Sequence, residues 1–71
     1  MRKYLIIIEK TGTGFSAYVP DLPGCIATGR TKQIVEKKIY DAIQFHLEGM
    51  KENKISIPVP KTEATTVLLH V

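Results

Sequence analysis

The sequence predicts an α+β fold in two layers, β-β-β-α-β, with a mostly antiparallel sheet and one helix on one face. Two observations lead to this prediction. Short apolar segments rich in β-branched residues, bounded by glycine and proline, occupy residues 3–29 and the C-terminal end. Between them, one stretch after Thr31 carries apolar residues at the 3.6-residue spacing of a helix. A chain of 71 residues is expected to form a single domain over residues 1–71.

The first strand, expected at residues 3–9, is apolar on both of its pleat faces. One face is formed by Tyr4, Ile6 and Ile8, and the other by Leu5 and Ile7. A second strand at residues 15–19 should pair with it antiparallel, through a hairpin loop whose glycines are expected to supply positive φ. Since one helix covers one face, we predict an oligomer interface, as a dimer or tetramer, on the uncovered face at Leu5, Ile7 and Tyr18.

The segment Pro20–Gly24 is expected to be a strand-breaking turn, because prolines cannot donate ladder hydrogen bonds and Gly24 suits a left-handed turn position. A short third strand should follow at residues 25–28. The helix is expected to begin after Thr31 as its N-cap and to end near Gly49. Residues 55–61 must be extended, since residues before proline avoid the helical region, and residues 65–71 are expected to be a closing strand.

Composition and charge narrow the class of protein. The single Cys and the lack of a zinc-like Cys/His spacing leave oligomerisation as the means to stabilise so short a chain. The formal net charge of +3 comes from scattered basic residues, which permits nucleic-acid binding without favouring it. The apolar N-terminal run is too short for a signal peptide or a membrane span, which indicates a cytoplasmic protein with no membrane association.

Two patterns suggest catalysis or cofactor binding, and each has a simpler explanation. Residues 12–17 match the G-x-G-x-x-A pattern of dinucleotide-binding proteins. A strand is expected to follow where that site would need a helix, so we interpret this segment as part of a hairpin. Cys25 as a nucleophile would need a base, and only His46 and His70 are available; a buried, packed Cys25 is the favoured interpretation. No cofactor is predicted.

A metal cluster of Glu9, Asp21 and Asp41 is also conceivable, but no spacing rule links these acids, and solvated acids are the simpler explanation. His46 is an unusual core residue within the apolar helix face, either bonded to a carbonyl or placed at a subunit interface. Ile34 and Phe45 project to one flank of the helix, where they either pack more deeply or contact a partner.

Three segments together resemble the N-terminal domain of HicB-type antitoxins: Y-V-P-D-L-P-G-C at residues 18–25, A-T-G-R-T at 27–31, and D-A-I-Q-F-H-L at 41–47. The resemblance covers roughly residues 4 to 50. It implies a partial RNase H-like fold without the catalytic acids, and an oligomer that binds and occludes a small HicA-type ribonuclease toxin. Relatives commonly carry a C-terminal DNA-binding segment; since this chain ends at Val71, we expect no separate DNA-binding domain and no DNA binding by this chain alone.

The sequence therefore predicts a non-enzymatic HicB-like antitoxin that neutralises a HicA-type toxin, with Asp21, Leu22, Ile34 and Phe45 as the predicted partner-binding residues. Two alternatives from other classes remain open at this point. One is a minimal or degenerate RNase H-like metal-dependent nuclease, and the other is a nucleic-acid-binding protein.

Overall fold

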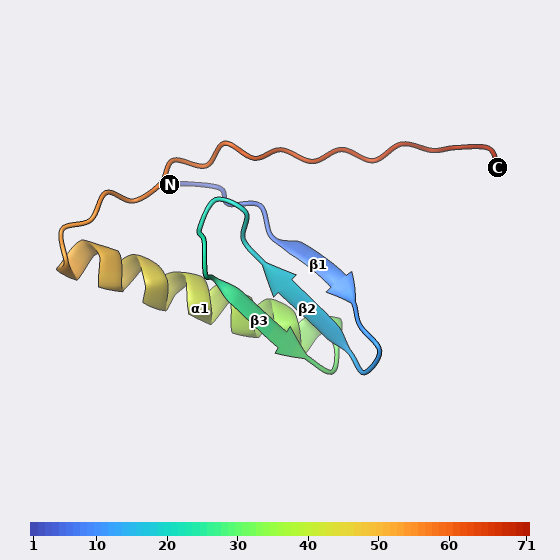
Figure 1. Cartoon of the computed structure of the whole chain (residues 1–71), viewed down its shortest axis with the longest axis horizontal. Coiled ribbons are helices and arrows are strands. Elements are labelled where there is room, and N and C mark those ends of the chain that lie inside the picture. The colour runs from blue at the N-terminus through green and yellow to red at the C-terminus, as the bar shows by residue number, and fades with distance from the viewer.

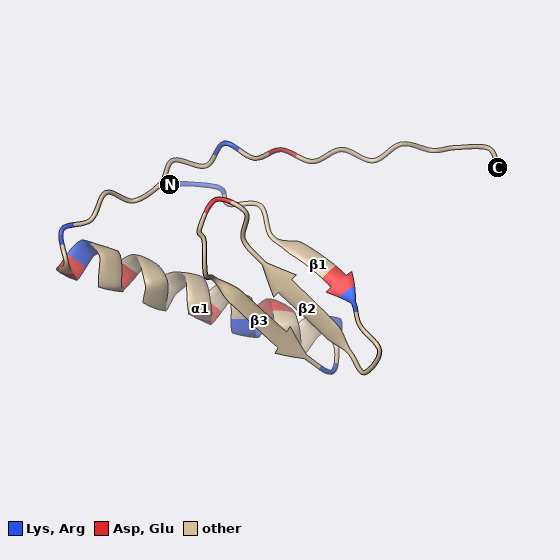
Figure 2. Cartoon of the chain, viewed as in Figure 1, with Lys and Arg blue, Asp and Glu red and all other residues tan.

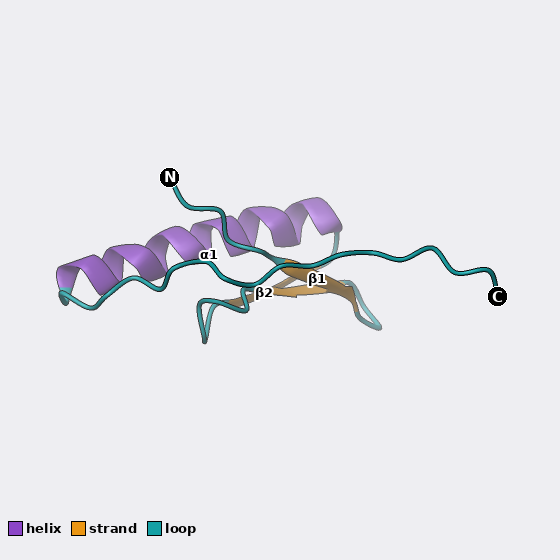
Figure 3. Cartoon of the chain, turned by 90° about the horizontal axis from the view of Figure 1, so that it is seen from above, coloured by secondary structure: helices purple, strands orange, loops and turns teal.

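The computed structural model describes all 71 residues and contains three strands followed by one helix (Figure 1). The elements are β1 (Ile7–Lys10), β2 (Phe15–Tyr18), β3 (Ile26–Gly29) and α1 (Lys32–Glu52). The strands form one antiparallel sheet in the order β1-β2-β3. The helix forms a second layer on one face of this sheet, as Figure 3 shows from above. The predicted α+β class is confirmed.

Strand register assigns the side chains to two faces. Ala17 of β2 lies opposite Ile8 of β1 and Ala27 of β3, and all three pack toward the helix. Tyr18 lies opposite Ile7 and Ile26, so these side chains point to the other face. The alternation predicted for the first two strands is therefore confirmed, with Tyr4, Ile6 and Ile8 on the helix side.

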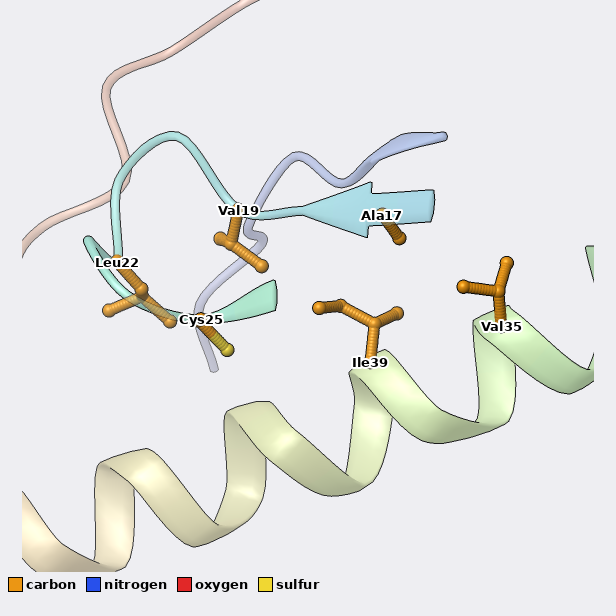
Figure 4. Packing of buried hydrophobic residues seen from close by; sticks show 6 residues of the cluster. All are labelled: Ala17, Val19, Leu22, Cys25, Val35 and Ile39. Carbon is orange, nitrogen blue, oxygen red and sulfur yellow. The ribbon is translucent and has the colours of Figure 1, made fainter. Parts of the chain in front are cut away.

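The hydrophobic core is small and lies where α1 crosses the sheet (Figure 4). Val35 and Ile39 of the helix pack against the strand side chain of Ala17 and against residues of the loop that joins β2 to β3. The six buried apolar residues are Ala17, Val19, Leu22, Cys25, Val35 and Ile39. Both helical members lie in the first half of α1, because the second half extends beyond the sheet.

The loop between β2 and β3 is held by its own backbone hydrogen bonds. The Leu22 N–H donates to the Val19 carbonyl, and the Cys25 N–H donates to the Leu22 carbonyl, each at 3.1 Å. The Val19 N–H donates to the Cys25 carbonyl at 3.2 Å, which closes the loop. Gly24 has φ of 87°, as the turn prediction requires, since few other residues adopt this conformation without strain. The loop is thus a compact turn that directs Leu22 and Cys25 inward.

The helix begins as predicted and ends later than predicted. The Thr31 hydroxyl accepts a hydrogen bond from the Ile34 N–H at 3.1 Å, which makes Thr31 the N-cap. Gly49 lies inside the last turns, and the helix continues to Glu52. Asn53 then stops it, because its side-chain amide donates to the Gly49 carbonyl at 2.8 Å. The following Lys54 has φ of 56°, which turns the chain back along the helix.

The predicted closing strand at residues 65–71 is not formed within the chain. The segment is extended, as its β-branched residues favour, but it has no strand partner and projects past β1 (Figure 1). An extended segment becomes a strand only when a neighbouring backbone satisfies its N–H and C=O groups. The expected β-β-β-α-β order is therefore β-β-β-α in this chain, followed by an extended tail.

The hairpin glycines have a different role from the one predicted. Neither Gly12 nor Gly14 has positive φ; Gly24 is the one glycine that does. Gly14 is instead required by close approach, because a Cβ on it would collide with the Gly29 carbonyl and lie 2.9 Å from the Arg30 Cα. The β1–β2 hairpin thereby packs directly on the backbone that leads into the helix.

We predict that Gly14→Ala lowers the free energy of unfolding by about 1–3 kcal/mol, the usual range for overpacking a site that cannot yield. The collision is with backbone atoms, which cannot rotate away. Urea denaturation followed by circular dichroism measures the change. Gly12→Ala is the matched control, since a Cβ added to Gly12 would meet no atom within 4 Å. Equal stability of the two variants would contradict this account of the hairpin.

Candidate partner-binding surfaces

Asp21 binds the C-terminal tail of its own chain. Its carboxylate accepts hydrogen bonds from the Lys61 and Thr62 N–H groups at 3.1 Å each and from the Thr62 hydroxyl at 2.8 Å. The Thr62 hydroxyl is the main cause of a lowered Asp21 pKa; burial opposes the shift, and the backbone bonds of Thr62 and Lys61 and the Lys61 charge add to it. Asp21 therefore joins the β2–β3 loop to the tail, and its oxygens are engaged within the chain.

Leu22 lies inside the core, which corrects its predicted role as a partner contact. Its side chain is 0% exposed, since the hydrogen-bonded turn directs it toward the helix. Asp21 is also buried. The outward-facing residues of this loop are Pro23 and Gly24. Of the four predicted partner-binding residues, only Ile34 and Phe45 present side chains to solvent.

We name the exposed side of α1 that carries Ile34, Lys38, Asp41 and Phe45 the helix flank. Phe45 is 80% exposed and Ile34 is 44% exposed, so neither residue packs deeply into the core. An ion pair between Asp41 and Lys37, at 2.9 Å, lies beside them and is open to water. The helix flank therefore presents two apolar side chains, Ile34 and Phe45, with the charged Lys38 and Asp41 between them.

A shallow groove adjoins the N-terminal end of the helix flank. It lies between the β1–β2 hairpin and the start of α1, and Ile34 and Phe15 supply its apolar lining. Arg30 and Lys38 add positive charge to its wall, while threonines from the hairpin loop add hydroxyl groups. This groove and the helix flank form one continuous surface through Ile34, which combines apolar area with hydrogen-bond donors.

The open face of the sheet carries an apolar row that crosses all three strands. Ile7, Tyr18 and Ile26 are successive cross-strand partners on the side away from the helix. Ile26 is 65% exposed, and Tyr18 is also exposed. The sequence placed Ile7 and Tyr18 here, but Ile26 was missed, because its membership depends on the register of β3 against β2.

His46 lies on the apolar side of α1, as predicted, but in the half of the helix that extends beyond the sheet. It is half-buried and makes no side-chain hydrogen bond, so the predicted bond to a carbonyl is not formed. The alternative prediction, a position at a subunit interface, stays a prediction.

The groups considered for catalysis are not brought together. Cys25 is packed in the core, as predicted, and burial raises the pKa of its thiol, which keeps it protonated. Residues 12–17 form the hairpin and β2, with no helix to receive a phosphate. Glu9, Asp21 and Asp41 lie on a strand, a loop and the helix, and no three acidic, His or Cys side chains form a metal-binding group.

Basic residues are not gathered into a stripe. In Figure 2, Lys and Arg lie at the N-terminus, along α1 and in the tail, with Asp and Glu between them on the helix. A nucleic-acid interface usually shows a continuous basic surface, so this distribution does not favour one. The helix is also not long and apolar enough to cross a membrane.

These features define a small α+β domain with exposed apolar surfaces and no cluster of reactive groups, which is typical of a protein-binding module. The chain belongs to the HicB-like antitoxin family of bacterial toxin–antitoxin systems, whose sequence pattern matches residues 4–68. The predicted family is thereby confirmed, and this family is a non-enzymatic component of such systems.

Individual relatives agree with this assignment. An uncharacterised 14.9 kDa protein of Haemophilus phage HP1 is 42% identical over 55 residues, which span 78% of this chain and 41% of that protein. A UPF0150 protein of Thermoplasma acidophilum is 38% identical over 66 residues, which span 92% of this chain and 96% of the relative. A chain in a solved HicA3–HicB3 toxin–antitoxin complex superposes with a TM-score of 0.70 at 33% identity, covering 84% of this chain and 70% of that one.

We predict that Asp21→Asn releases the tail from the β2–β3 loop. The amide cannot accept from all three donors, and its own NH₂ group would face the N–H groups of Lys61 and Thr62. Amide hydrogen exchange measured by NMR should show loss of protection at Lys61 and Thr62. Asp41→Asn is the matched control, because it removes an exposed ion pair on the helix and should leave the tail unchanged.

The same contact should respond to acid. A carboxyl whose pKa is lowered by folding contributes stability above its ordinary value of 3.8, and this contribution is lost as the pH falls through the lower folded pKa. The Lys61 and Thr62 amide shifts should therefore change with a midpoint below pH 3.8. A midpoint at or above the ordinary pKa would contradict the bonded carboxylate.

Proposed function

We propose that this chain is an antitoxin that binds and neutralises a small HicA-type ribonuclease toxin in the cytoplasm of a prokaryotic cell. The observation that carries the proposal is the structural similarity to a chain of the HicA3–HicB3 complex, at 33% identity and a TM-score of 0.70. The family match over residues 4–68 supports it independently. We propose that residues 1–71 act as one domain in this role.

The helix flank and its adjoining groove are our proposed toxin-binding surface. Phe45 has the features of an interface anchor, since it is a large aromatic side chain that is 80% exposed in the free chain. Ile34 lies about three helical turns before it and joins the flank to the groove. Arg30 and Lys38 stand at the rim, where charged groups improve partner choice and association rate more than affinity.

The open sheet face is our proposed surface for self-association. Ile7, Tyr18 and Ile26 form an uninterrupted apolar row, and Leu5 extends it toward the N-terminus. Two such faces stacked together would bury side chains that one helix cannot cover, as in other sheet-on-sheet packings. The need for such additional burial is large, because only 7 of the 71 residues are buried in the isolated chain.

The two alternative functions have less support. A metal-dependent nuclease needs converging acids, and Glu9, Asp21 and Asp41 are separated, with Asp21 already bound to the tail. A nucleic-acid-binding protein needs clustered basic residues, and these are dispersed.

We predict that Phe45→Ser abolishes neutralisation without unfolding the chain, since the residue lies outside the core. Loss of an exposed aromatic anchor should weaken toxin binding by about 2 kcal/mol or more, which is roughly thirtyfold in Kd. Co-expression with the small protein encoded beside it tests rescue of growth, and titration calorimetry measures the Kd.

Tyr40→Ser is the control for this experiment. Tyr40 is an exposed aromatic residue on a different side of the same helix, so its loss should leave toxin binding intact. Equal loss with both variants would reject the helix flank as the binding surface. Failure of the unmodified chain to relieve toxicity or to co-purify with the neighbouring protein would reject the antitoxin function itself.

We also predict that Ile26→Lys weakens self-association by at least about tenfold, because it places a charge in the centre of the proposed apolar interface. Sedimentation equilibrium measures the dissociation constant. Ile55→Lys is the control, since Ile55 is similarly exposed but lies in the extended segment after the helix. An unchanged dissociation constant for Ile26→Lys would remove the open face from the interface.

A further inference from the structure

The C-terminal arm, by which we mean residues 65–71, is an apolar extended segment without a partner in this chain. Leu68 is 99% exposed, and Val67, Leu69 and Val71 are exposed as well. In an extended chain, Val67, Leu69 and Val71 share one pleat face, while Leu68 lies on the other between Thr66 and His70. An exposed segment with these residues is prone to pair with a sheet edge.

The residues just before the arm are held to the rest of the chain. The arm is therefore exposed although its starting point is fixed. The Tyr4 hydroxyl donates to the Pro58 carbonyl at 2.6 Å, and Asp21 holds Lys61 and Thr62. The residues just before the arm, Thr62 to Ala64, lie against residues 3–6, which lead into β1. These contacts end at the arm, which then projects away from the sheet (Figures 1 and 3).

The edge of β1 is the complementary feature. β1 pairs only with β2, so the backbone groups of its other edge are unpaired. The first two residues of β1 are apolar, with Ile8 toward the helix and Ile7 toward the open side, and the charged Glu9 and Lys10 follow them. The arm can place Val67, Leu69 and Val71 beside one of these isoleucines and Leu68 beside the other, whereas the free edge of β3 offers the small residues Ala27 and Gly29 on the helix side.

We propose that the arm forms a fourth strand on the free β1 edge of a second copy of this chain, and that two copies exchange their arms reciprocally. Donor and acceptor are present in the same sequence, so a two-fold arrangement satisfies both arms and leaves none free. Seven residues reach about 23 Å when extended, which is enough to cover the length of β1. The arm's own β1 is not the acceptor in this arrangement, because the arm runs past it without pairing.

The dimensions of the chain agree with an exchanged element. Its radius of gyration is 14.0 Å, whereas a compact domain of this length would have about 11 Å. The family match continues to residue 68, so most of the arm belongs to the domain. Exchange would bury apolar side chains that one copy leaves in water, and it would supply the fourth strand that the sequence predicts.

The proposal is tested by NMR on the full chain in an equal mixture of isotope-labelled and unlabelled copies, unfolded and refolded together. Isotope-filtered spectra should show contacts between the methyl groups of Leu69 or Val71 in one copy and those of Ile7 or Ile8 in the other. Contacts confined within one copy would overturn the proposal in favour of the chain's own β1 edge. An arm without contacts, or with contacts only after a toxin is added, would overturn it too.

A variant provides a second measurement. Leu68→Pro removes an N–H group from the arm and should weaken dimerisation at least about tenfold in sedimentation equilibrium, with loss of the intermolecular contacts. Ser56→Pro is the matched control, since Ser56 lies in an exposed extended segment and its N–H makes no hydrogen bond. Equal dimer dissociation constants for the two variants would overturn the proposal. Toxin binding by each variant is measured in a separate experiment.

Discussion

One helix can cover only one face of a three-stranded sheet, and most features of this molecule depend on that constraint. The contact between α1 and the sheet buries Val35 and Ile39 against Ala17 and the β2–β3 loop, and little else is fully buried. Conformational entropy lost on folding must be offset by burial, and a core of this size therefore needs additional burial elsewhere. The exposed apolar side chains of the open face and the arm are where that burial is available.

The β2–β3 loop is structural, although its composition invites a catalytic interpretation. Each notable residue has a conformational or packing role: Gly24 supplies positive φ, Leu22 and Cys25 fill the core, and Asp21 holds the tail. A single short motif thereby fixes the direction of β3, fills one end of the core and sets the path of the C-terminal segment. Folding therefore accounts for each notable residue of the motif without a site for chemistry.

The sequence predicts local structure well here, because local structure depends on patterns within a few residues. The two-residue alternation of residues 15–19 and the helical spacing after Thr31 each correspond to an element in the structure. The turn at Gly24 and the cap at Thr31 were also predictable, since both are matters of backbone conformation and one nearby hydrogen bond.

What the sequence did not predict depends on contacts between distant residues. The inward direction of Leu22 results from three backbone hydrogen bonds, and the role of Asp21 depends on residues 40 positions away. Gly14 owes its identity to the approach of Gly29, and Ile26 joins the open face through strand register. The closing strand is absent for a related reason, since pairing depends on a distant edge, and the arm runs past the free edge of β1 without pairing to it.

The proposed surfaces are compatible with one another because they belong to different layers. The open face and the β1 edge lie on the sheet side, whereas the helix flank lies on the other layer and points to solvent. Self-association through the sheet would leave both helix flanks of a dimer exposed. Each copy could then hold a toxin without giving up the burial that stabilises it. Neutralisation and assembly would thus be compatible, and a dimer would hold two toxin-binding surfaces at a fixed spacing.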